Sequence, residues 1–297
     1  MRQSVLVTGA SGFVGKCVVA TLHDSGLHVV PVSRRAVAIG DLPVWTLGDD
    51  AGAVLRRLLR DEAITDVVHL AGRINGSDDD LEVANTGFTR LMLDSIDASG
   101  LKVNFYYLSS VSAIGPAGAY GRQKRACEDM ILAAPLTRVV GLRSSLLYGP
   151  GDDKNVATLI HAVRRWPAIP VLGMSHVKLQ PLYVQDLAKA FGSLLEGRGR
   201  NGNMYVIAGP RQEYLADMIR ILQQRVKRTV PLMPVPLAPL RVVVGLIDRV
   251  FPFLKLPSQQ IRALHSHRPY DSSDVKSDLG VSLTRFEDGV AAFVPPP

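Results

Sequence analysis

The chain has few cysteines and few aromatic residues, and it lacks any long run of basic residues. Cys17 and Cys127 are the only two cysteines among 297 residues. A disulfide framework is therefore excluded, and the cysteine spacing is not that of a metal site. We expect both thiols to be buried apolar filler in a reducing cytoplasm, and we predict no metal site.

Basic residues outnumber acidic ones, giving a formal net charge of +7, but they are scattered along the chain. Pairs such as Arg34-Arg35 and Arg164-Arg165 stand far apart and are not interleaved with aromatic side chains, as they often are in nucleic-acid-binding proteins. We therefore predict no nucleic-acid partner. The excess positive charge is interpreted as that of a protein that handles phosphorylated ligands.

The chain also lacks an apolar leader, because it runs directly from Met1 into an apolar strand pattern at Ser4. We expect a cytoplasmic protein whose mature chain starts here. The most apolar stretch, 231–257, has hydrophobic residues at helical spacing together with Arg241, Asp248 and Arg249. These charges predict no transmembrane segment, but the pattern leaves a peripheral membrane contact open.

Apolar, β-rich runs alternate with helical patterns along the first half of the chain. The predicted strands cover 4–8, 29–33, 66–71, 103–109 and 137–142, and the predicted helices cover 13–25, 51–61, 79–99, 119–134 and 153–165. Alternation of this kind is typical of a parallel sheet with helices on both faces. We predict an α/β fold with a Rossmann-type, doubly wound parallel sheet.

The pattern loosens after residue 150. Short strands are predicted near 169–172, 203–207 and 230–233, and helices near 185–196, 211–226 and 236–250. We predict a dinucleotide-binding domain over 1–150 and a smaller lobe over 151–297 that mainly binds substrate. The two should interleave, because Leu182–Val184 is predicted to return to the main sheet ahead of a helix within 180–197.

Three glycines stand where the first predicted strand turns into the first predicted helix. They are Gly9, Gly12 and Gly15 in Thr8-Gly-Ala-Ser-Gly-Phe-Val-Gly15. Gly9 permits a tight turn, Gly12 lets the backbone approach phosphate oxygens, and Gly15 allows helix and strand to pack closely. The N–H groups of the helix N-terminus then face an anion. The pattern predicts a dinucleotide pyrophosphate site.

No carboxylate stands at the end of the second predicted strand. Eighteen residues beyond Gly15, where an NAD enzyme usually places an acid on the ribose 2′-hydroxyl, the chain has Ser33 followed by Arg34 and Arg35. An acid would repel a 2′-phosphate, whereas serine and arginine can bind it. We predict that NADP(H) is the preferred cofactor, with NAD(H) as the alternative.

A tyrosine and a lysine one helical turn apart follow the strand end Leu108-Ser-Ser110. Tyr120 and Lys124 should lie on one helix face, where the ammonium group would favour ionisation of the phenol. Tyr120 could then exchange a proton with a substrate hydroxyl or ketone, while Ser110 holds the same oxygen. Hydride would move between the substrate carbon and a nicotinamide. We predict Ser110, Tyr120 and Lys124 as the catalytic residues.

Together these segments resemble the extended branch of the short-chain dehydrogenase/reductase superfamily, often called the NAD-dependent epimerase/dehydratase family. The resemblance covers nearly the whole chain. It also rests on Asp66-Val-Val-His-Leu-Ala71, Leu142-Arg-Ser-Ser-Leu-Leu-Tyr-Gly-Pro-Gly151 and Tyr183-Val-Gln-Asp-Leu-Ala188. It implies an NAD(P)-dependent enzyme with a Rossmann domain and an interleaved C-terminal substrate lobe.

The resemblance implies roles for individual residues. The cofactor-binding set is Gly9, Ser11, Gly12, Phe13, Val14 and Gly15 at the pyrophosphate, Ser33 and Arg34 at the ribose, Asp49 at the adenine, Leu70, Ala71 and Gly72 along the cleft, and Tyr120 and Lys124 at the nicotinamide ribose. His69, a lone histidine in an apolar strand, is interpreted as a satisfied core residue. Asn85 and Thr89 are interpreted as structural anchors.

The resemblance also reduces the number of reactions that the chain is expected to catalyse. Family members that are 4,6-dehydratases carry an Asp-Glu pair just after the catalytic serine or threonine, and this chain has Val111 and Ser112 there. Neither can move the proton that water elimination needs, so dehydration is disfavoured. What remains is reduction of a 4-keto nucleotide-diphosphate sugar with Tyr120 as proton donor, as in bacterial surface-polysaccharide synthesis, or epimerisation at the same carbon.

Substrate contacts are implied by the same resemblance. Asn155 follows the segment that ends at Gly151, and Arg268 opens Arg268-Pro-Tyr-Asp271, which resembles the family's late diphosphate clamp. The chain departs from the family at Leu146 and Leu179, where many members have asparagine and arginine. Lys178 is predicted to supply the missing charge.

Two other functions stay open. The first is a reductase of an apolar, steroid- or flavonoid-like ketone, whose pocket would include the predicted helix at 236–251. The second is a non-catalytic NADP(H)-binding regulatory protein, against which the intact Ser110, Tyr120 and Lys124 argue. The resemblance further implies a homodimer, formed through the helix that bears Tyr120 and Lys124 and its neighbour.

Overall fold

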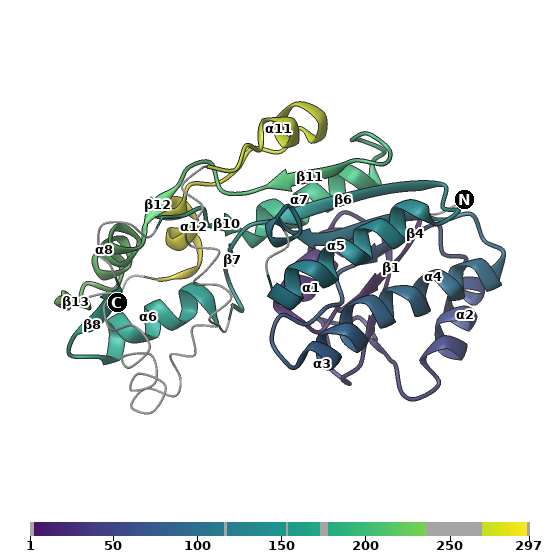
Figure 1. Ribbon diagram of the computed structural model, residues 1–297, viewed down its shortest axis with the longest axis horizontal. Helices are drawn as coiled ribbons and strands as arrows, with labels where there is room; N and C mark the ends of the chain where they lie inside the picture. The colour runs from purple at the N-terminus through teal and green to yellow at the C-terminus, as the bar shows by residue number, and fades with distance from the viewer. Residues whose placement is uncertain (1–2, 116–117, 153, 173–177, 236–268, 296–297) are drawn as a thin grey trace. The chain divides into compact units, whose positions relative to one another are not determined.

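The computed structural model describes residues 3–115, 118–152, 154–172, 178–235 and 269–295. The chain divides into two compact units, each of which is made of several segments (Figure 1). The larger unit consists of Met1–Ser145, Val184–Ala208 and Asp271–Leu283, and the smaller of Leu146–Tyr183, Gly209–Tyr270 and Thr284–Pro297.

A seven-stranded parallel sheet forms the centre of the larger unit. Its order is β11-β6-β5-β4-β1-β2-β3. The strands are β1 (Ser4–Thr8), β2 (His28–Ser33), β3 (Trp45–Thr46), β4 (Asp66–His69), β5 (Asn104–Ser110), β6 (Arg138–Ser144) and β11 (Met204–Ile207). The order reverses between β1 and β4, and ligands of doubly wound sheets bind at such a switch point. The predicted Rossmann-type α/β fold is confirmed.

Helices cover both faces of this sheet (Figure 1). On one face α1 (Phe13–Asp24) packs against α7 (Val184–Leu195), and on the other α2 (Ala51–Asp61) packs against α4 (Phe88–Ser99), beside α5 (Gly118–Ala133). Strand side chains alternate between faces, so Phe105 and Tyr107 of β5 both reach the core beneath α2, α4 and α5. Because both faces are covered, all of β1 is buried, which explains its uninterrupted apolar run.

The last strand of the sheet differs from the predicted one. The sequence predicts that Leu182–Val184 returns to the main sheet, but β10 (Leu182–Tyr183) pairs with β7 (Leu147–Tyr148) in the smaller unit. The seventh strand is instead β11, which pairs with β6. The physical reason is length, since α7 begins at Val184 and leaves only two residues for β10, whereas β11 is longer and buries Tyr205 and Ile207 in the core.

The predicted helix over 79–99 is interrupted. The structure has α3 (Asp78–Glu82), a single π-helical turn η1 (Val83–Gly87) and then α4. A π-helical turn carries one extra residue and changes the direction in which side chains project. In η1 that turn directs the buried Asn85 inward.

The smaller unit contains three two-stranded sheets among its described residues. The pairs are β7 with β10, β9 (Lys178–Leu179) with β12 (Glu213–Tyr214), and β8 (Ile169–Leu172) with β13 (Leu232–Val235). The helices in its described ranges are α6 (Asn155–Arg165), α8 (Leu215–Val226) and α12 (Phe286–Phe293). They enclose a core that includes Tyr148, Met218 and Phe286. The predicted helix at 236–250 lies outside the described residues.

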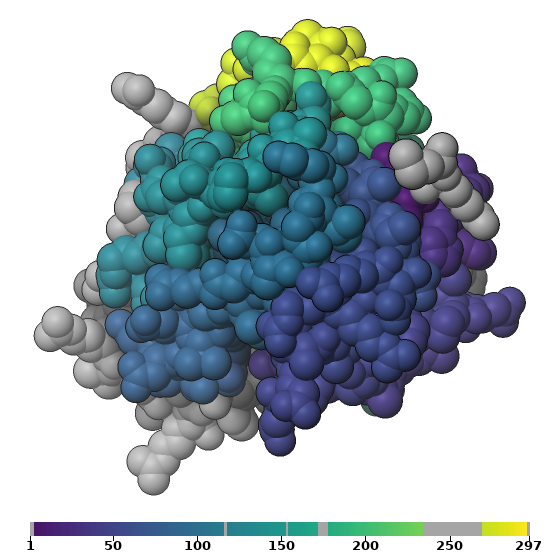
Figure 2. All heavy atoms as spheres, turned by 90° about the vertical axis from the view of Figure 1, so that its right-hand side faces the viewer, coloured from purple at the N-terminus to yellow at the C-terminus, as the bar shows by residue number. Residues whose placement is uncertain are grey.

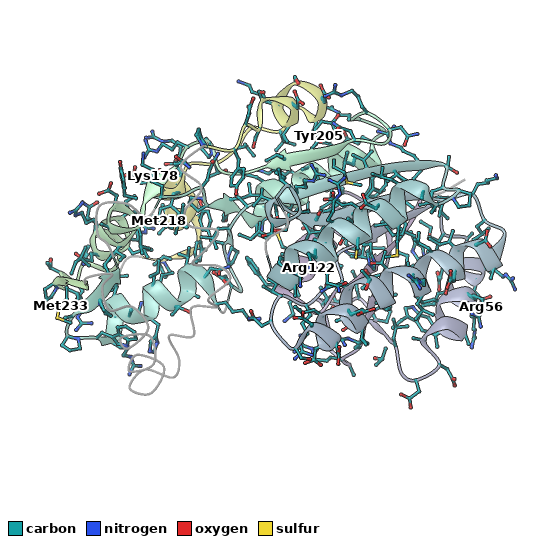
Figure 3. The ribbon with its side chains drawn as sticks, viewed as in Figure 1. Arg56, Arg122, Lys178, Tyr205, Met218 and Met233 are labelled. Atoms are coloured by element: carbon teal, nitrogen blue, oxygen red, sulfur yellow. The ribbon has the colours of Figure 1, made fainter. Side chains whose placement is uncertain are left out.

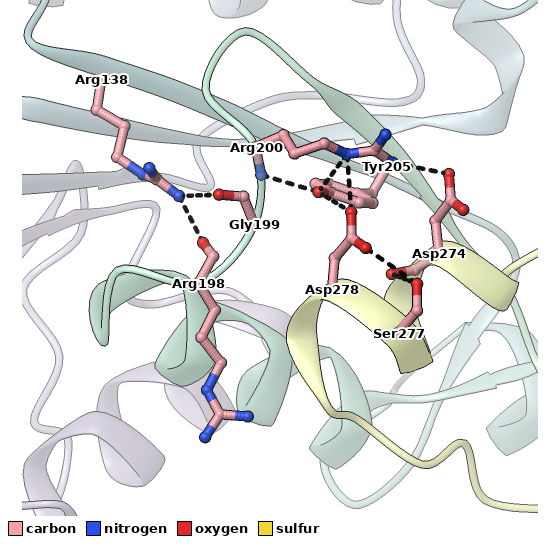
Figure 4. A network of polar contacts seen from close by, with 8 residues as sticks. All are labelled: Arg138, Arg198, Gly199, Arg200, Tyr205, Asp274, Ser277 and Asp278. Carbon is pink, nitrogen blue, oxygen red and sulfur yellow. Dashed lines mark hydrogen bonds and ion pairs between the residues drawn. The ribbon is translucent and has the colours of Figure 1, made fainter.

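A short helix late in the chain, α11 (Ser273–Leu279), belongs to the larger unit. It is held by what we call the α11 network, shown in Figure 4. Arg200 binds Asp274 at 3.2 Å and Asp278 at 2.8 Å, and the Tyr205 hydroxyl donates to Asp278 at 2.6 Å. In the space-filling view (Figure 2), the green and yellow segments around α7, β11 and α11 gather at the top.

None of the helices in the described ranges is both long and apolar enough to cross a membrane. Cys17 and Cys127 are free thiols. Cys127 is buried in the core as predicted, whereas Cys17 is only partly buried, which differs from the prediction. The stretch for which the sequence leaves a peripheral membrane contact open lies mostly outside the described residues.

Candidate active site

The glycine-rich turn after β1 is packed so tightly that two of its glycines admit no side chain. Gly9 has a φ of +70°, in the left-handed region, and a Cβ there would lie 2.8 Å from the Ala71 backbone nitrogen. A Cβ on Gly15 would overlap the Gly9 carbonyl oxygen and lie 2.7 Å from Ala10 Cα. Strand, turn and helix therefore meet in backbone contact, as the spacing of the glycines predicts.

The N-terminus of α1 is open to an anion. Its N-cap is Gly12, no side chain accepts from the first N–H groups, and the first turn carries no acidic residue. Uncapped N–H groups and the helix dipole together favour a bound phosphate oxygen. The backbone N–H groups of Phe13 and Val14 therefore fit the pyrophosphate of a dinucleotide at the switch point of the sheet.

The end of β2 is joined to the glycine-rich turn by two hydroxyls. The Ser33 hydroxyl donates to Ser11 Oγ at 2.6 Å and accepts from the Arg35 backbone N–H at 3.0 Å. Arg34 is exposed and forms no ion pair with any described residue. Ser33 thus braces the turn, while Ser11 keeps a hydroxyl proton to donate. Asp49, predicted at the adenine, is exposed between β3 and α2.

His69 is a satisfied core residue, as predicted. Its ring is fully buried, and it stacks on Phe88 and Tyr107. Nδ1 lies 2.9 Å from Thr8 Oγ1 and Nε2 lies 3.1 Å from Thr89 Oγ1. Burial, and then the charge of Lys124, lowers the pKa of His69 to about 3, so the ring is neutral at physiological pH.

Thr8 and Asn85 shape the segment that follows β4. The Thr8 hydroxyl accepts from the Ala71 N–H at 3.2 Å, and the Asn85 amide binds both the N–H and the carbonyl of Arg73, at 2.9 and 3.0 Å. A Cβ on Gly72 would lie 3.3 Å from Lys124 Nζ. The predicted cofactor-cleft segment is thus held between the glycine-rich turn and the lysine, and Asn85 is an anchor as predicted.

Lys124 is buried with its ammonium group pointing into the larger unit. Nζ donates to the Leu108 carbonyl at 2.8 Å and lies 4.7 Å from the centroid of the Tyr107 ring. Burial lowers the pKa of Lys124 to about 8, against the raising influence of Cys127 and Glu128. The side chain is therefore still mostly protonated at neutral pH.

Tyr120 differs from the prediction in its ionisation. The sequence predicts that Lys124 favours the ionised phenol, but burial raises the pKa of Tyr120 to about 12, and a hydrogen bond with Ser110 lowers it only in part. The ammonium group of Lys124 is directed at Leu108 and over Tyr107 instead. Tyr120 is therefore a neutral phenol, suited to donate a proton to an oxygen that gains negative charge.

Ser110 completes the group at the end of β5. It is 9% exposed, its hydroxyl accepts from the Ser112 backbone N–H at 3.2 Å, and it lowers the pKa of the neighbouring Tyr120 phenol. The structure thus brings Ser110 and Tyr120 together, with Lys124 one helical turn away. Two neutral hydroxyl groups side by side can bind one carbonyl oxygen.

Residues predicted to contact substrate have other partners in the smaller unit. Asn155 Nδ2 donates to the Leu147 carbonyl at 3.1 Å, at the start of α6. Lys178, labelled in Figure 3, places Nζ 4.8 Å from the centroid of the Tyr214 ring across the β9–β12 pair. Arg268 lies outside the described residues. For Asn155 and Lys178 the role in substrate binding stays a prediction.

One buried carboxylate near the site is not identified by the sequence reasoning. Glu128 of α5 is 1% exposed and forms an ion pair with Arg143, which belongs to the segment 142–151 that resembles the family. The sequence does contain a signal for Glu128. It follows Lys124 by four residues, and this spacing puts both side chains on one helix face.

Comparison with known proteins identifies the type of fold and the family. A family model described as "NAD dependent epimerase/dehydratase family" matches residues 5–208. The structure is similar to that of MoeE5 in complex with UDP-glucuronic acid and NAD, with a TM-score of 0.78 and 23% identity, covering 98% of this chain and 97% of that one. It is also similar to RMD from Pseudomonas aeruginosa complexed with NADPH, with a TM-score of 0.73, 20% identity, and coverage of 98% and 97%.

Three curated relatives have different activities. UDP-glucose 4-epimerase of Vibrio cholerae is 25% identical over 80% of this chain and 80% of its own length. UDP-2-acetamido-2,6-beta-L-arabino-hexul-4-ose reductase of Pseudomonas aeruginosa is 28% identical over 67% of this chain and 51% of its own length. Ceramide reductase of Caulobacter vibrioides is 29% identical over 63% of this chain and 59% of its own length. Matches at this level do not single out one substrate.

Proposed function

The chain belongs to the NAD dependent epimerase/dehydratase family of NAD(P)-dependent enzymes, and on that premise we propose that it reduces the 4-keto group of a nucleotide-diphosphate sugar. The similarity to a curated 4-ketosugar reductase supports this proposal. An epimerase is the alternative, and the similarity to UDP-glucose 4-epimerase speaks for it.

The observation that favours reduction is the protonation state of Tyr120. Burial raises its pKa to about 12, and Ser110 lowers it only in part, so the phenol holds a proton throughout the physiological range. A ketone reduction needs a proton donor at the carbonyl oxygen, whereas an epimerase must begin by removing a proton from a hydroxyl. A neutral Tyr120 is ready for the first of these tasks.

The residues of the larger unit fit a bound dinucleotide. The N-terminus of α1 is uncapped, and Gly9 and Gly15 pack too closely to carry side chains. Backbone N–H groups would therefore lie directly beside a bound pyrophosphate. When bound, the cofactor supplies the hydride. Ser110 orients the substrate carbonyl, Tyr120 donates the proton to its oxygen, and Lys124 holds the nicotinamide ribose with its ammonium group.

We assign the nucleotide-sugar diphosphate to the smaller unit, with Asn155, Lys178 and Arg268 as contacts. Only the resemblance to the family supports these three assignments. The amide of Asn155 and the ammonium of Lys178 each retain donor capacity beyond their present partners, since each side chain carries more than one N–H. A homodimer through α5 and its neighbour α4 is proposed on the same basis, and light scattering of the purified protein tests it.

We propose NADP(H) as the preferred cofactor. No carboxylate stands at the end of β2, and the exposed Arg34 and the Ser11–Ser33 hydroxyl pair are suited to a 2′-phosphate. Titration of the protein fluorescence with NADPH and NADH tests this, and Arg34→Ser should weaken NADPH binding while leaving NADH binding unchanged. Equal affinity of the native protein for both cofactors would contradict the preference.

The reaction is tested by incubating the protein with 4-keto and 4-hydroxy nucleotide sugars and each cofactor, followed by mass spectrometry. A 4-ketosugar should gain two hydrogens while NADPH is oxidised, and Tyr120→Phe should bind NADPH but form no product. Interconversion of 4-hydroxy sugars without net cofactor oxidation would assign the enzyme as an epimerase.

The similarity to a ceramide reductase favours a second candidate, a reductase of an apolar ketone. This alternative uses the same three catalytic residues and differs only in what the smaller unit binds. Thermal unfolding in the presence of UDP-sugars and of apolar ketones separates the two, because a ligand at a hundred times its Kd adds about 2.7 kcal/mol of stability. A shift with apolar ketones alone would favour the second candidate.

A further inference from the structure

We infer that Glu128 is a positioning residue that fixes the catalytic end of β5 against the helix that carries Tyr120 and Lys124. The inference rests on the proposed function, because it assigns a role in the catalysis proposed for this site. Glu128, Ser109 and Arg143 together are called the strand clamp below.

The strand clamp is a carboxylate surrounded by donors from two neighbouring strands. Glu128 Oε1 accepts a hydrogen bond from the Ser109 hydroxyl and one of 2.9 Å from Arg143 Nε, and Oε2 accepts from Arg143 Nη2 at 2.6 Å. Glu128 and Ser109 are each only 1% exposed. A bidentate arginine and a hydroxyl together satisfy a buried carboxylate and define its orientation.

The register of the sheet explains why one side chain can hold both strands. Ser109 of β5 and Arg143 of β6 are direct register partners, so their side chains lie side by side on the face covered by α5. The carboxylate of Glu128, on α5, contacts both of these side chains. Its contact with Ser109 holds the strand one residue before the hydroxyl of Ser110.

Lys124 makes the matching contact one turn earlier on the same helix. Its Nζ holds the Leu108 carbonyl, so Lys124 and Glu128 bind consecutive residues of β5. Two contacts one helical turn apart define both the position and the rotation of the strand end relative to α5. The separation of the Ser110 and Tyr120 hydroxyls follows from that arrangement.

Glu128 also acts on Lys124 through its charge. The titratable groups that face Lys124 come from three elements and are His69 of β4, Tyr107 of β5, and Tyr120, Cys127 and Glu128 of α5. Among these, Glu128 is the one carboxylate. Burial lowers the pKa of Lys124, and Cys127 and then the negative charge of Glu128 act in the opposite direction. Removing that charge should therefore make the ammonium group easier to deprotonate.

The first experiment follows the titration of Lys124 directly and needs no substrate. The Cε resonance of Lys124, assigned by comparison with Lys124→Arg, is recorded against pH in the native protein, in Glu128→Gln and in Asp129→Asn. Asp129 is the neighbouring acid on α5, and its partner is the exposed Arg125. We expect a midpoint of about 8 in the native protein. Glu128→Gln should lower it, because a negative charge close to the ammonium group is removed, and Asp129→Asn should leave it unchanged.

The second experiment separates positioning from a purely structural role. Turnover is measured per bound cofactor, so that unfolded protein does not contribute. Glu128→Gln should lower kcat by roughly tenfold or more with KM changed less than about twofold, because the ground-state contacts of the substrate are untouched. Ser109→Ala should lower kcat by less and leave the Lys124 titration unchanged, because the ion pair remains.

The results of these two experiments test the role of Glu128 independently of the proposed function. A folded Glu128→Gln protein with an unchanged Lys124 midpoint and unchanged kcat would overturn the inference and leave Glu128 as a structural brace. Should Glu128→Gln fail to fold, Ser109→Ala decides, and an unchanged kcat in that variant would overturn the inference. Absence of turnover by the native protein with every nucleotide sugar contradicts the proposed substrate, whereas the Lys124 titration still tests the effect of Glu128.

Discussion

The strand clamp and the α11 network use the same kinds of groups in opposite surroundings. Each joins an arginine to carboxylate and hydroxyl partners and ties together segments far apart in the sequence. In the strand clamp the carboxylate of Glu128 is 1% exposed, whereas in the α11 network the side chain of Arg200 is 63% exposed (Figure 4). The two clusters contain similar chemical groups and differ in how far these groups are exposed to water.

This difference determines what each cluster can do. Water screens the charges of an exposed ion pair, so the pair contributes little and its field acts only on its own partners. A buried carboxylate is costly unless it is fully bonded, and its field reaches other buried groups such as Lys124. The strand clamp can therefore influence the catalytic site, and the α11 network holds a helix in place.

The largest effect should come from Tyr120, the proposed proton donor. Tyr120→Phe removes the proton donor and should lower kcat by about 10²- to 10⁴-fold, while the affinity for NADPH changes little. Stopped-flow turnover and fluorescence titration measure the two quantities. Residual turnover close to that of the native protein would mean that another group donates the proton.

The next largest effect should be the loss of stability when the strand clamp loses its acid. Glu128→Ala leaves the guanidinium of Arg143, 18% exposed, without its partner, and breaking a buried pair costs about 3 kcal/mol or more. Urea denaturation measures the free energy of unfolding. A loss below about 1 kcal/mol would place the strand clamp in the same class as surface ion pairs.

A smaller effect should appear in the pH dependence. The pKa of Lys124 is about 8 in the folded protein and 10.5 ordinarily, so above pH 8 the unfolded chain binds more protons than the folded one. The free energy of unfolding should therefore gain a rising contribution from about pH 8 upward, which the raised pKa of Cys17 opposes from about pH 9 and the raised pKa of Tyr120 from about pH 10. Over the same range kcat should fall as the Lys124 ammonium is lost.

Lys124→Met is the control for this pH dependence. Denaturation at several pH values between about 8 and 9, below the range in which Cys17 and Tyr120 oppose it, should show the rise in the native protein and its absence in the variant. The opposite slopes of stability and kcat are the signature of a buried lysine that is needed in its charged form. Parallel slopes would show that a different group titrates.

The smallest effect should come from the α11 network. Asp274→Asn removes one partner of Arg200, but the contact of Arg200 with Asp278 remains. Because the pair is exposed, we expect a small decrease in the melting temperature and no change in kcat. A clear change in kcat would mean that the network acts on the catalytic site, and the contrast between the two clusters would no longer hold.

Much of the larger unit is predictable because its signals are local. The uninterrupted apolar run of β1, the glycines at 9, 12 and 15, and the spacing of Tyr120 and Lys124 each reflect a constraint within one or two turns of chain. The predicted helix over 51–61 coincides with α2. For elements of this kind, periodicity and steric limits are sufficient.

The errors of prediction have a common cause, which is competition between distant segments. Whether β10 or β11 joins the main sheet depends on which strand has the length and apolar surface to pair with β6, and no local pattern reports that. The same holds for η1, where the bond of Asn85 to the Arg73 backbone accompanies a break in the helical register. Strand pairing and helix register at these places depend on contacts with residues that are distant in the sequence.

The amino-acid sequence by itself determined the type of sheet, the glycine-rich turn after β1 and the helix that carries Tyr120 and Lys124, because steric and periodic constraints act between near neighbours in the chain. Only the tertiary structure decided the charge of these groups. Burial keeps Tyr120 protonated and lowers the pKa of Lys124, and Glu128 opposes that lowering from a position set by two strands. The physical reason is that a pKa depends on the solvent and charges around a group, and folding creates those surroundings.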